Sequence, residues 1–321
     1  MTAAALHPTV REQVESLRLQ FSAAEPFRHV VIDGFLDPGF CSQLIAEFPP
    51  FQNKYAVNER GEIGRKSAIP TLAGLSAAYT RFDALMKEPE FLLFVGRITG
   101  IDGLLYDPEY VGGGTHENLD GQDLDVHVDF NYHPATHFHR RLNLIVFLND
   151  RWEESWGGSL ELLRDPWATG AQDVRSVLPI ANRAVIFETT ENSWHGFPRI
   201  ALPPDEKISR RSIAVYFYTK ARPSDRTAAP HATVYHQRPL PEHIQAGQRL
   251  TEEDALEIAT LISRRDKQIQ FLYERELEFS NLITGITSSP SFRIGRALTW
   301  PARALRSAFG KSHGNDTGNP R

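Results

Sequence analysis

Short runs of apolar and β-branched residues recur between residues 104 and 220, and they constrain the fold more than any other feature of the chain. The runs are LLYDPEYV, LDVHVDF, RRLNLIVFLN, GSLELLR, VRSVLPI, RAVIFE, WHGFPRI and RSIAVYFYT, and clusters of Gly, Pro, Asn and Asp separate them. No helical pattern stands between the runs, whereas a parallel βαβ sheet needs a helix after each strand. The pattern predicts an antiparallel sandwich or barrel, which we interpret as a jelly-roll core.

The segments on either side of this core have a different character. Residues 1–100 show mainly helical spacing, with one early strand in HVVIDGFL at 29–36. Residues 221–250 are rich in Pro and polar side chains, which is typical of an extended connector. Three acidic residues near the start of 251–284 suit the first turn of a long helix. The predicted fold class is therefore α+β with a mainly β core, a double-stranded β-helix (jelly roll) at 101–220, flanked by N-terminal helices and a long C-terminal helix.

The predicted C-terminal helix has an apolar stripe along it. The stripe consists of Leu261, Ile262, Ile269, Leu272 and Tyr273. We interpret it as a face that docks on the barrel, with a dimer-forming coiled coil, and hence a homodimer, as the alternative. The basic tail at 285–321 contains a Trp and is compatible with contact with an anionic membrane surface. Because Gly295 and Pro301 interrupt a helix there, a flexible solvated tail is the favoured interpretation.

Charge and cysteine content exclude several classes of protein. The chain has 35 Lys and Arg against 40 Asp and Glu, a net charge of −5 over 321 residues, which argues against a nucleic-acid partner. Cys41 is the single cysteine, so an intrachain disulfide and a cysteine-based metal site are excluded, and a reducing compartment is favoured. The N-terminus shows no signal-peptide pattern, and the longest apolar stretches are too short to form a transmembrane segment. We therefore expect a cytoplasmic protein.

One His-x-Asp triplet, His127-Val128-Asp129, lies in the run LDVHVDF. A chain with 12 histidines and 40 acidic residues contains such a triplet by chance, so its value depends on its context. Residues i and i+2 of a strand point to the same face, so His127 and Asp129 can converge inside a barrel. Two neutral imidazoles and one carboxylate form the facial triad of a non-haem iron site, which leaves positions open for other ligands. His195, in the run WHGFPRI on another strand, is the candidate third ligand.

Two arginines, Arg210 and Arg211, stand at the head of the last strand of the core. If the metal binds a 2-oxo acid, the far carboxylate of that acid needs a cation inside the barrel. A guanidinium can bind such a carboxylate through two parallel hydrogen bonds. Because side chains alternate along a strand, only one of the two arginines can face the interior.

Taken in order, these motifs resemble the prolyl-4-hydroxylase-like branch of the Fe(II)/2-oxoglutarate-dependent dioxygenases. The resemblance begins with HVVIDGFLDPGFCSQLI and continues through HVDF, RRLNLIVFLND, WGGSLELL, NRAVIFE, WHGF and RRSIAVYF, so it covers about residues 28–220. It implies a double-stranded β-helix, Fe(II), 2-oxoglutarate and O2 as cosubstrates, and often L-ascorbate dependence. It also implies His127, Asp129 and His195 as iron ligands. The basic residue of this family stands two before a Ser on the last strand, which selects Arg210 over Arg211 as the partner of 2-oxoglutarate.

The resemblance further implies an activity, the hydroxylation of an unactivated C–H bond in a peptidyl proline or a small molecule, with release of succinate and CO2. Two alternatives come from other classes of protein. One is a metal-binding barrel without an oxidative role, similar to a zinc hydrolase, which retained zinc and no 2-oxoglutarate dependence would favour. The other is an inactive barrel that serves as an interaction module built on the helix at 252–283.

Two local features depart from the family or from regular structure. Many relatives have a Tyr near the end of the LNLIVFLN strand, and its hydroxyl reaches the distal carboxylate of 2-oxoglutarate. Here Phe147 occupies that position and cannot donate a hydrogen bond. Asn143 lies on the same face by alternation and is the candidate replacement for this contact. The triplet Gly112-Gly113-Gly114 is interpreted as a flexible loop at the mouth of the pocket.

Overall fold

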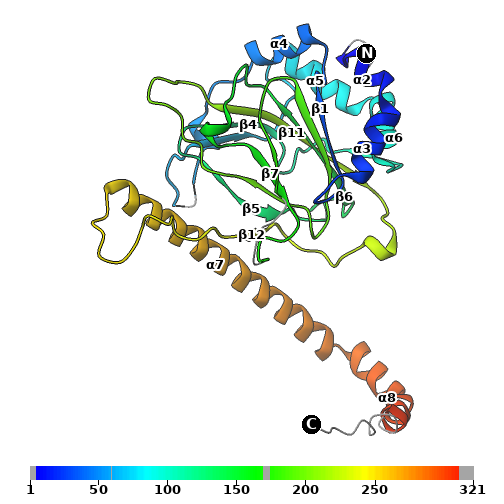
Figure 1. The fold of residues 1–321 in the computed structure, drawn as a ribbon. Coiled ribbons are helices and arrows are strands. Elements are labelled where there is room, and N and C mark those ends of the chain that lie inside the picture. Colours follow the sequence, from blue (N-terminus) through cyan, green and yellow to red (C-terminus); the bar gives the residue numbers. More distant parts are fainter. Residues whose placement is uncertain (1–4, 59, 169–173, 311–321) are drawn as a thin grey trace, which may run out of the picture. The chain divides into compact units, whose positions relative to one another are not determined.

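The structure is a computed structural model that describes residues 5–58, 60–168 and 174–310 of the chain (Figure 1). The helices are α2 (Pro8–Glu12), α3 (Val14–Ala23), α4 (Pro38–Ala46), α5 (Ala77–Lys87), α6 (Pro89–Thr99), α7 (Glu252–Ser288) and α8 (Pro290–Gly310). The strands are β1 (His29–Asp33), β2 (Lys66–Ile69), β3 (Leu105–Tyr106), β4 (Gly114–Asn118), β5 (Leu124–Val128), β6 (His139–Phe147), β7 (Leu160–Leu163), β8 (Arg175–Val177), β9 (Arg183–Glu188), β10 (Trp194–Phe197), β11 (Arg210–Thr219) and β12 (Val234–His236). Two compact units divide the chain after Leu261, and the first contains all of these strands.

Two antiparallel sheets form the core of the first unit. The larger sheet has seven strands in the order β1-β9-β6-β11-β4-β2, with β3 paired to β11, and the smaller has the order β12-β5-β10-β7-β8. Neighbouring strands such as β1 and β9, or β5 and β10, are far apart in sequence and pair antiparallel. Such crossing connections between two facing sheets define a jelly roll. The sheet order therefore confirms the predicted core and, with the flanking helices, the predicted fold class.

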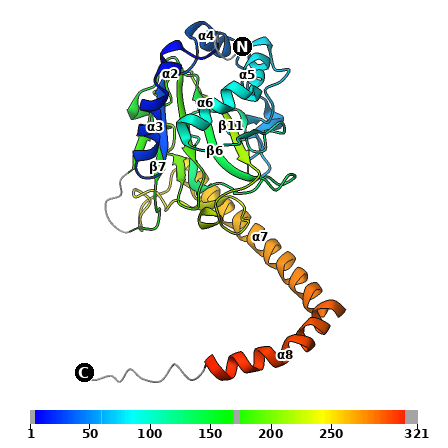
Figure 2. The same cartoon turned by 90° about the vertical axis from the view of Figure 1, so that its right-hand side faces the viewer.

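The N-terminal helices lie against one face of the larger sheet, with α6 in front of β6 and β11 in Figure 2 and α3 packed on β1 and α6. α6 shows why: Phe91, Phe94, Val95 and Ile98 are buried at helical spacing, whereas Leu93 between them is 68% exposed. Phe91 reaches the sheet, where its ring centroid lies 6.3 Å from that of Phe217 on β11. Helices and sheet thus share one hydrophobic core, and the other face of the sheet is left to line the pocket described below.

Two short strands lie in segments where the sequence analysis predicts none. β2 lies within residues 1–100, where it pairs with β4, and β12 lies within the 221–250 connector, where it pairs with β5. Both stand at a sheet edge in the strand order. Strands of this length carry too few alternations to be distinguished from loop by periodicity, and their pairing partners are remote in sequence. The prediction of one strand in the first 100 residues is therefore wrong.

The Gly112-Gly113-Gly114 segment is not simply a flexible loop. Gly114 is the first residue of β4 and has φ +103°, a backbone conformation that side-chain-bearing residues rarely adopt. A Cβ added to it would lie 1.9 Å from the carbonyl oxygen of Ile69 on β2. The close approach of the two strands therefore requires a glycine at this position. The predicted flexible loop does not include Gly114, and only Gly112 and Gly113 lie outside the strand.

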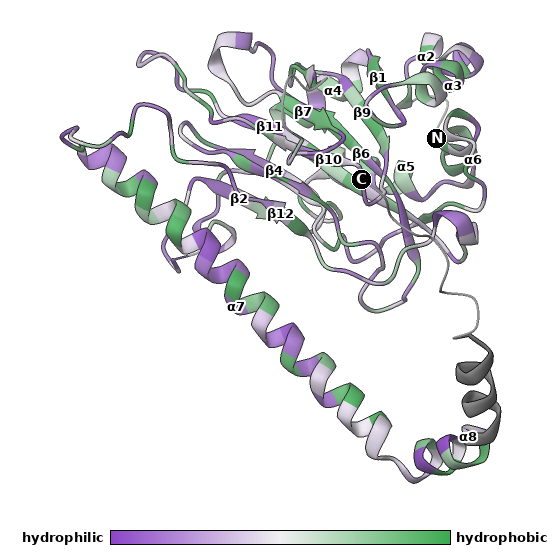
Figure 3. Cartoon of the chain, turned by 60° about the horizontal axis from the view of Figure 1, so that its bottom comes forward, coloured by the Kyte–Doolittle hydropathy of each residue, from purple (hydrophilic) through white to green (hydrophobic). Residues whose placement is uncertain are grey.

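The long C-terminal helix α7 begins as predicted. Thr251 and Asp254 bond reciprocally: Asp254 N donates to Thr251 Oγ1 over 3.1 Å, and Thr251 N donates to Asp254 Oδ2 over 2.9 Å. Of the predicted docking stripe, Leu261 belongs to the first unit and is buried there. The other members belong to the second unit, where polar residues alternate with apolar ones along the helix (Figure 3), and their docking on the barrel stays a prediction.

The described part of the tail is helical. α8 runs through both Gly295 and Pro301, where the sequence analysis predicts an interruption. Each of these residues weakens only its own turn, and the amphipathic pattern of the remaining residues supports the helix across them. Residues 311–321 lie outside the described range. Among the described residues, no helix is both long enough and apolar enough to cross a membrane.

Candidate metal centre

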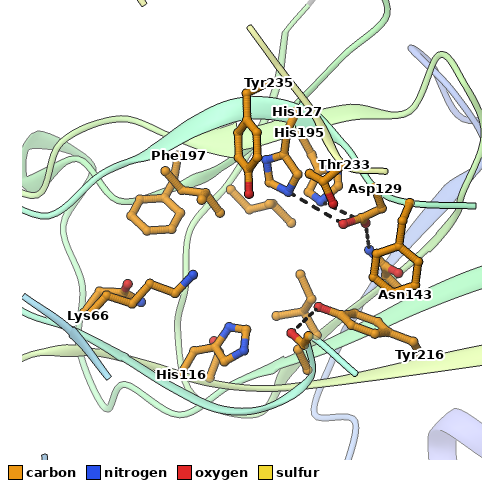
Figure 4. Close-up of a pocket in the computed structure, with 18 of the residues that line it drawn as sticks. Lys66, His116, His127, Asp129, Asn143, His195, Phe197, Tyr216, Thr233 and Tyr235 are labelled. Atoms are coloured by element: carbon orange, nitrogen blue, oxygen red, sulfur yellow. Dashed lines mark hydrogen bonds and ion pairs between the residues drawn. The ribbon is translucent and has the colours of Figure 1, made fainter. Parts of the chain in front are cut away.

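Three buried side chains converge between the sheets. His127 Nε2 lies 3.7 Å from Asp129 Oδ1, and His195 Nε2 lies 3.5 Å from Asp129 Oδ2. One ligand atom from each residue falls within 4.8 Å of the other two, and the three residues are 5–7% exposed. Figure 4 shows the two imidazoles and the carboxylate on one side of a shared pocket. The grouping predicted from the sequence is thus brought together by the fold.

Sheet pairing places the two histidines. β5 and β10 are neighbours in the smaller sheet, and His195 is the direct cross-strand partner of His127. Their ring centroids lie 4.3 Å apart, because side chains opposite each other on adjacent strands point to the same face. Asp129 follows β5 directly, two residues after His127, and so reaches the same point.

Hydrogen bonds to the backbone orient both imidazoles. Nδ1 of His127 lies 2.9 Å from the carbonyl oxygen of Asp125, and Nδ1 of His195 lies 2.9 Å from that of Ser193. These carbonyls accept the Nδ1 proton, so the lone pair of each neutral ring is on Nε2, which faces the cluster. Burial lowers the pKa of His127 to about 3 and also lowers the pKa of His195, which keeps both rings neutral. Both nitrogens are therefore prepared to bind a metal.

Arg140 and Asn143 hold the carboxylate of Asp129. Arg140 Nη2 donates to Asp129 Oδ2 over 3.0 Å, and Asn143 Nδ2 donates to the same oxygen over 2.8 Å. Burial alone would raise the pKa of Asp129, but the charge of Arg140 and the hydrogen bond from Asn143 hold it below its ordinary value. The aspartate is therefore charged at neutral pH and fixed in orientation.

The environment of Asn143 differs from its predicted role. Its Oδ1 accepts from Arg140 Nε over 3.1 Å and from Nη2 over 2.9 Å, so both ends of the amide serve the Asp129 network. Arg140 itself was not singled out by the sequence, although it is 1% exposed and its guanidinium lies 3.6 Å from the centroid of the Tyr216 ring. The sequence feature that could have identified Arg140 as a pocket residue is its position in the run RRLN, three residues before Asn143.

The structure places Arg210 inside the pocket and Arg211 outside it. Arg210 is 4% exposed, its Nε donates to the Gly158 carbonyl oxygen over 2.6 Å, and burial lowers its pKa to about 9. Its guanidinium lies 4.3 Å from the Phe197 ring centroid and 5.1 Å from that of Phe147. The Arg211 side chain is 39% exposed and pairs with Glu117 on the opposite face of the sheet. This arrangement supports the choice of Arg210 over Arg211.

The pocket has a volume of about 240 Å³ and receives residues from both sheets. Several lie in segments that the sequence analysis treated as helical or as connector. These residues are Lys66, Thr233 and Tyr235. Tyr235 on β12 places its ring centroid 5.2 Å from that of His127. No local motif marks them, since they reach the pocket only through strand pairing.

The donor set fits a divalent metal with open positions. Two neutral imidazole nitrogens and one carboxylate form the combination of the non-haem Fe(II) oxygenases, and the pocket leaves room beside them. The absence of cysteine from the cluster argues against a structural zinc site, which is built mainly from thiolates.

Comparisons with known proteins agree with this site. Residues 114–218 match the 2OG-Fe(II) oxygenase superfamily. Prolyl 3-hydroxylase OGFOD1 from Mus musculus is 34% identical over 80 residues, which are 25% of this chain and 14% of that protein. The chain thus corresponds to only a small part of the length of this relative.

The solved structures that the chain matches include several oxygenases. A prolyl hydroxylase from Trichoplax adhaerens, in complex with a hypoxia inducible factor peptide fragment, has TM-score 0.47 and 12% identity over 66% of this chain and 91% of that chain. A Pseudomonas putida prolyl-4-hydroxylase has TM-score 0.43 and 16% identity over 64% of this chain and 99% of that chain.

The matched segment contains all three residues of the His–Asp–His cluster and both Arg210 and Asn143. The predicted cofactors, Fe(II) and 2-oxoglutarate, are those of the matched superfamily. Residues 114–218 are therefore similar to the 2OG-Fe(II) oxygenase superfamily, in agreement with the family resemblance seen in the sequence.

Proposed function

We propose that this chain is an Fe(II)- and 2-oxoglutarate-dependent dioxygenase that hydroxylates an unactivated C–H bond. The observation that supports this most directly is the buried convergence of His127, Asp129 and His195 in one pocket with the buried cation of Arg210. Fe(II) bound there, with 2-oxoglutarate and O2, supplies the oxidising power for hydroxylation and yields succinate and CO2.

The residues of the chain prepare the site for these groups. His127 and His195 present unprotonated Nε2 atoms, and Asp129 adds one negative charge that Arg140 orients. The Nε of Arg210 is used by Gly158, so its two Nη groups are the ones that bind the distal carboxylate of 2-oxoglutarate. Phe147 and Phe197 flank this guanidinium and exclude water from it, which strengthens the ion pair.

The substrate enters where the pocket is lined by exposed residues, beside Gly112 and the 37%-exposed Tyr235. The chemical class of the substrate is a peptidyl proline or a small molecule, and the name of the mouse relative supports the proline.

L-Ascorbate would serve as an additional reductant that maintains Fe(II). A cytoplasmic location suits the single, buried Cys41.

Anaerobic titration tests the proposal. Fe(II) followed by 2-oxoglutarate is expected to produce the weak visible charge-transfer band of a chelated 2-oxo acid, and His127→Ala is expected to abolish it. The matched control is His137→Asn, because His137 is exposed and Asn tolerates its φ of +57°. If the protein binds Fe(II) but shows no charge-transfer band, or if zinc stays bound throughout purification, the proposed dioxygenase activity is rejected. Either result would favour the non-oxidative metal-binding barrel.

We also propose that α7 forms a homodimer. Apolar residues recur along it at spacings of three, four or seven, and they are 50–64% exposed: Ile269, Leu272, Phe279, Ile283 and Ile286. Light scattering of the full chain should report a dimer that Ile283→Glu converts to a monomer. Exposed Leu256, in the first turns of the same helix and off this heptad pattern, provides the control variant Leu256→Glu. A wild-type monomer would refute the dimer.

For α8 we propose contact with an anionic membrane surface. The 21 residues of α8 contain four arginines and no acidic residue, and Ile294, Leu298 and Trp300 are 60–77% exposed. Co-sedimentation of the full chain should occur with phosphatidylserine vesicles and not with phosphatidylcholine vesicles. Leu298→Glu should abolish it without changing the 2-oxoglutarate titration. Equal sedimentation with both vesicle types would contradict the charge argument.

A further inference from the structure

Two cross-strand rows of residues line the pocket on the side opposite the metal ligands. In the first row, Lys66 on β2, Asn118 on β4 and Arg210 on β11 are successive register partners. In the second row, His116 on β4, Ser212 on β11 and Phe147 on β6 are successive partners. Partners across strands point to the same face, and all of these residues except Phe147 line the pocket.

This wall has polar capacity that the described protein does not use. His116 Nε2 and Asn118 Oδ1 are buried and have no hydrogen-bond partner among the described residues. Figure 4 shows His116 pointing into the cavity, across from His127 and Asp129. An unsatisfied buried polar group is unfavourable by itself, so a polar ligand group is expected to meet this wall.

The distal carboxylate of 2-oxoglutarate needs more than one donor, and the expected second donor is missing. Phe147 has no hydroxyl, and the amide of Asn143 is used by Asp129 and Arg140. Among the described residues, no carboxylate pairs with Arg210, which lies in the same row as Lys66. Besides the hydroxyl of Ser212, which also lines the pocket, a further donor must come from another element of the pocket.

Lys66 is placed to supply it. Its side chain points into the cavity from β2 toward the centre of the pocket (Figure 4). Burial lowers the pKa of His116 to about 3, and the positive charges of Lys66 and Arg210 add to this shift. Lys66 and Arg210 are therefore two cations on the same wall of the pocket, in one cross-strand row with Asn118.

We propose that Lys66 is a cosubstrate-specificity residue whose ammonium binds, together with Arg210, the distal carboxylate of 2-oxoglutarate. This inference rests on the proposed function, and it adds an element from outside the matched domain, since β2 precedes residue 114. Lys66 thereby replaces the hydroxyl that Phe147 lacks, and it makes the pocket select a dicarboxylic 2-oxo acid over a monocarboxylic one.

Calorimetric titration of the anaerobic Fe(II)-loaded full chain tests the proposal with two ligands of equal carbon number. 2-Oxoglutarate has the distal carboxylate and 2-oxopentanoate lacks it. Lys66→Met should weaken 2-oxoglutarate binding by about tenfold or more, the usual effect of losing one charge-assisted hydrogen bond, and should leave 2-oxopentanoate binding unchanged. Lys66→Arg should retain most of the selectivity.

Arg65→Met is the matched control, because Arg65 is exposed and donates to the Asp120 carbonyl oxygen outside the pocket. If Lys66→Met does not fold, Lys66→Gln serves in its place. Equal 2-oxoglutarate affinity in the wild type and the Lys66 variant would overturn the inference, as would an equal loss for both ligands. A wild type that binds Fe(II) but not 2-oxoglutarate would instead reject the proposed function.

Discussion

Truncation of Asn143 tests whether the network around Asp129 prepares the metal site or only stabilises the fold. Asn143→Ala removes one hydrogen bond to the Asp129 carboxylate and the oxygen that accepts from Arg140. Arg140 and Asp129 remain paired over 3.0 Å, so neither charge is left alone. Three hydrogen bonds to charged groups are lost, one to Asp129 and two from Arg140. Each contributes about 1.5 kcal/mol at the lower end of the usual range, so the free energy of unfolding of the metal-free protein should fall by about 4.5 kcal/mol.

Metal affinity should fall as well, because Asp129 loses one of the two donors that orient it. Removing a residue that orients a metal ligand typically weakens binding by about 10- to 100-fold. Urea unfolding of the metal-free protein measures the first effect, and anaerobic calorimetric titration with Fe(II) measures the second. Together they separate stability from ligand orientation.

The control is Asn149→Ala. Asn149 is also a buried asparagine of the same unit, but it bonds the backbone of Pro179 and Arg211 and lies outside the metal pocket. It should lower the free energy of unfolding without changing Fe(II) affinity. If Asn143→Ala and Asn149→Ala both destabilise the protein and both bind Fe(II) as the wild type does, the network is structural only and the reasoning is refuted.

Two further predictions concern the backbone and the start of α7. Gly114→Ala should prevent stable folding, because its Cβ would lie 1.9 Å from the Ile69 carbonyl oxygen, whereas Gly103→Ala, at φ +67° with nothing within 4 Å, should cost only about 1 kcal/mol. Thermal unfolding compares them, and similar melting temperatures would contradict the clash. Hydrogen bonds from Thr251 lower the pKa of Asp254 from 3.8 to about 2. A lowered carboxyl pKa stabilises the folded state above 3.8, so the difference in melting temperature between wild type and Asp254→Ala should shrink as pH falls from 3.8 toward 2. A difference independent of pH would argue against this cap.

The metal ligands could be predicted because their signal is local. Alternation within one strand places His127 and Asp129 on the same face, and the same rule separates Arg210 from Arg211. His195 could be predicted as the third ligand because it lies on another strand of the same barrel. The predicted core and the buried face of α6 rest on periodicity, which survives in a single sequence.

The rest of the pocket depends on pairing between remote strands. Lys66 and Tyr235 come from strands of four and three residues, and only their registers with β4 and β5 bring them to the site. Arg140 precedes Asn143 in an apolar strand, where a buried arginine is not expected from the sequence. Its burial is explained by the ion pair with Asp129, which only the folded structure reveals. The role of Asn143 could not be assigned for the same reason, since its hydrogen bonds follow from the position of Arg140.

The pairing of β12 with β5 has a consequence for where the domain can be cut. In the order β12-β5-β10-β7-β8, the strand that carries His127 is internal only because β12 covers it. A chain shortened to the matched region, ending at residue 218, would leave the N–H and C=O groups of β5 without that neighbour. Open strand edges recruit other chains, so such a fragment would be prone to aggregate through its metal-binding strand. A minimal version of this domain without that open edge must therefore include the connector, at least through His236.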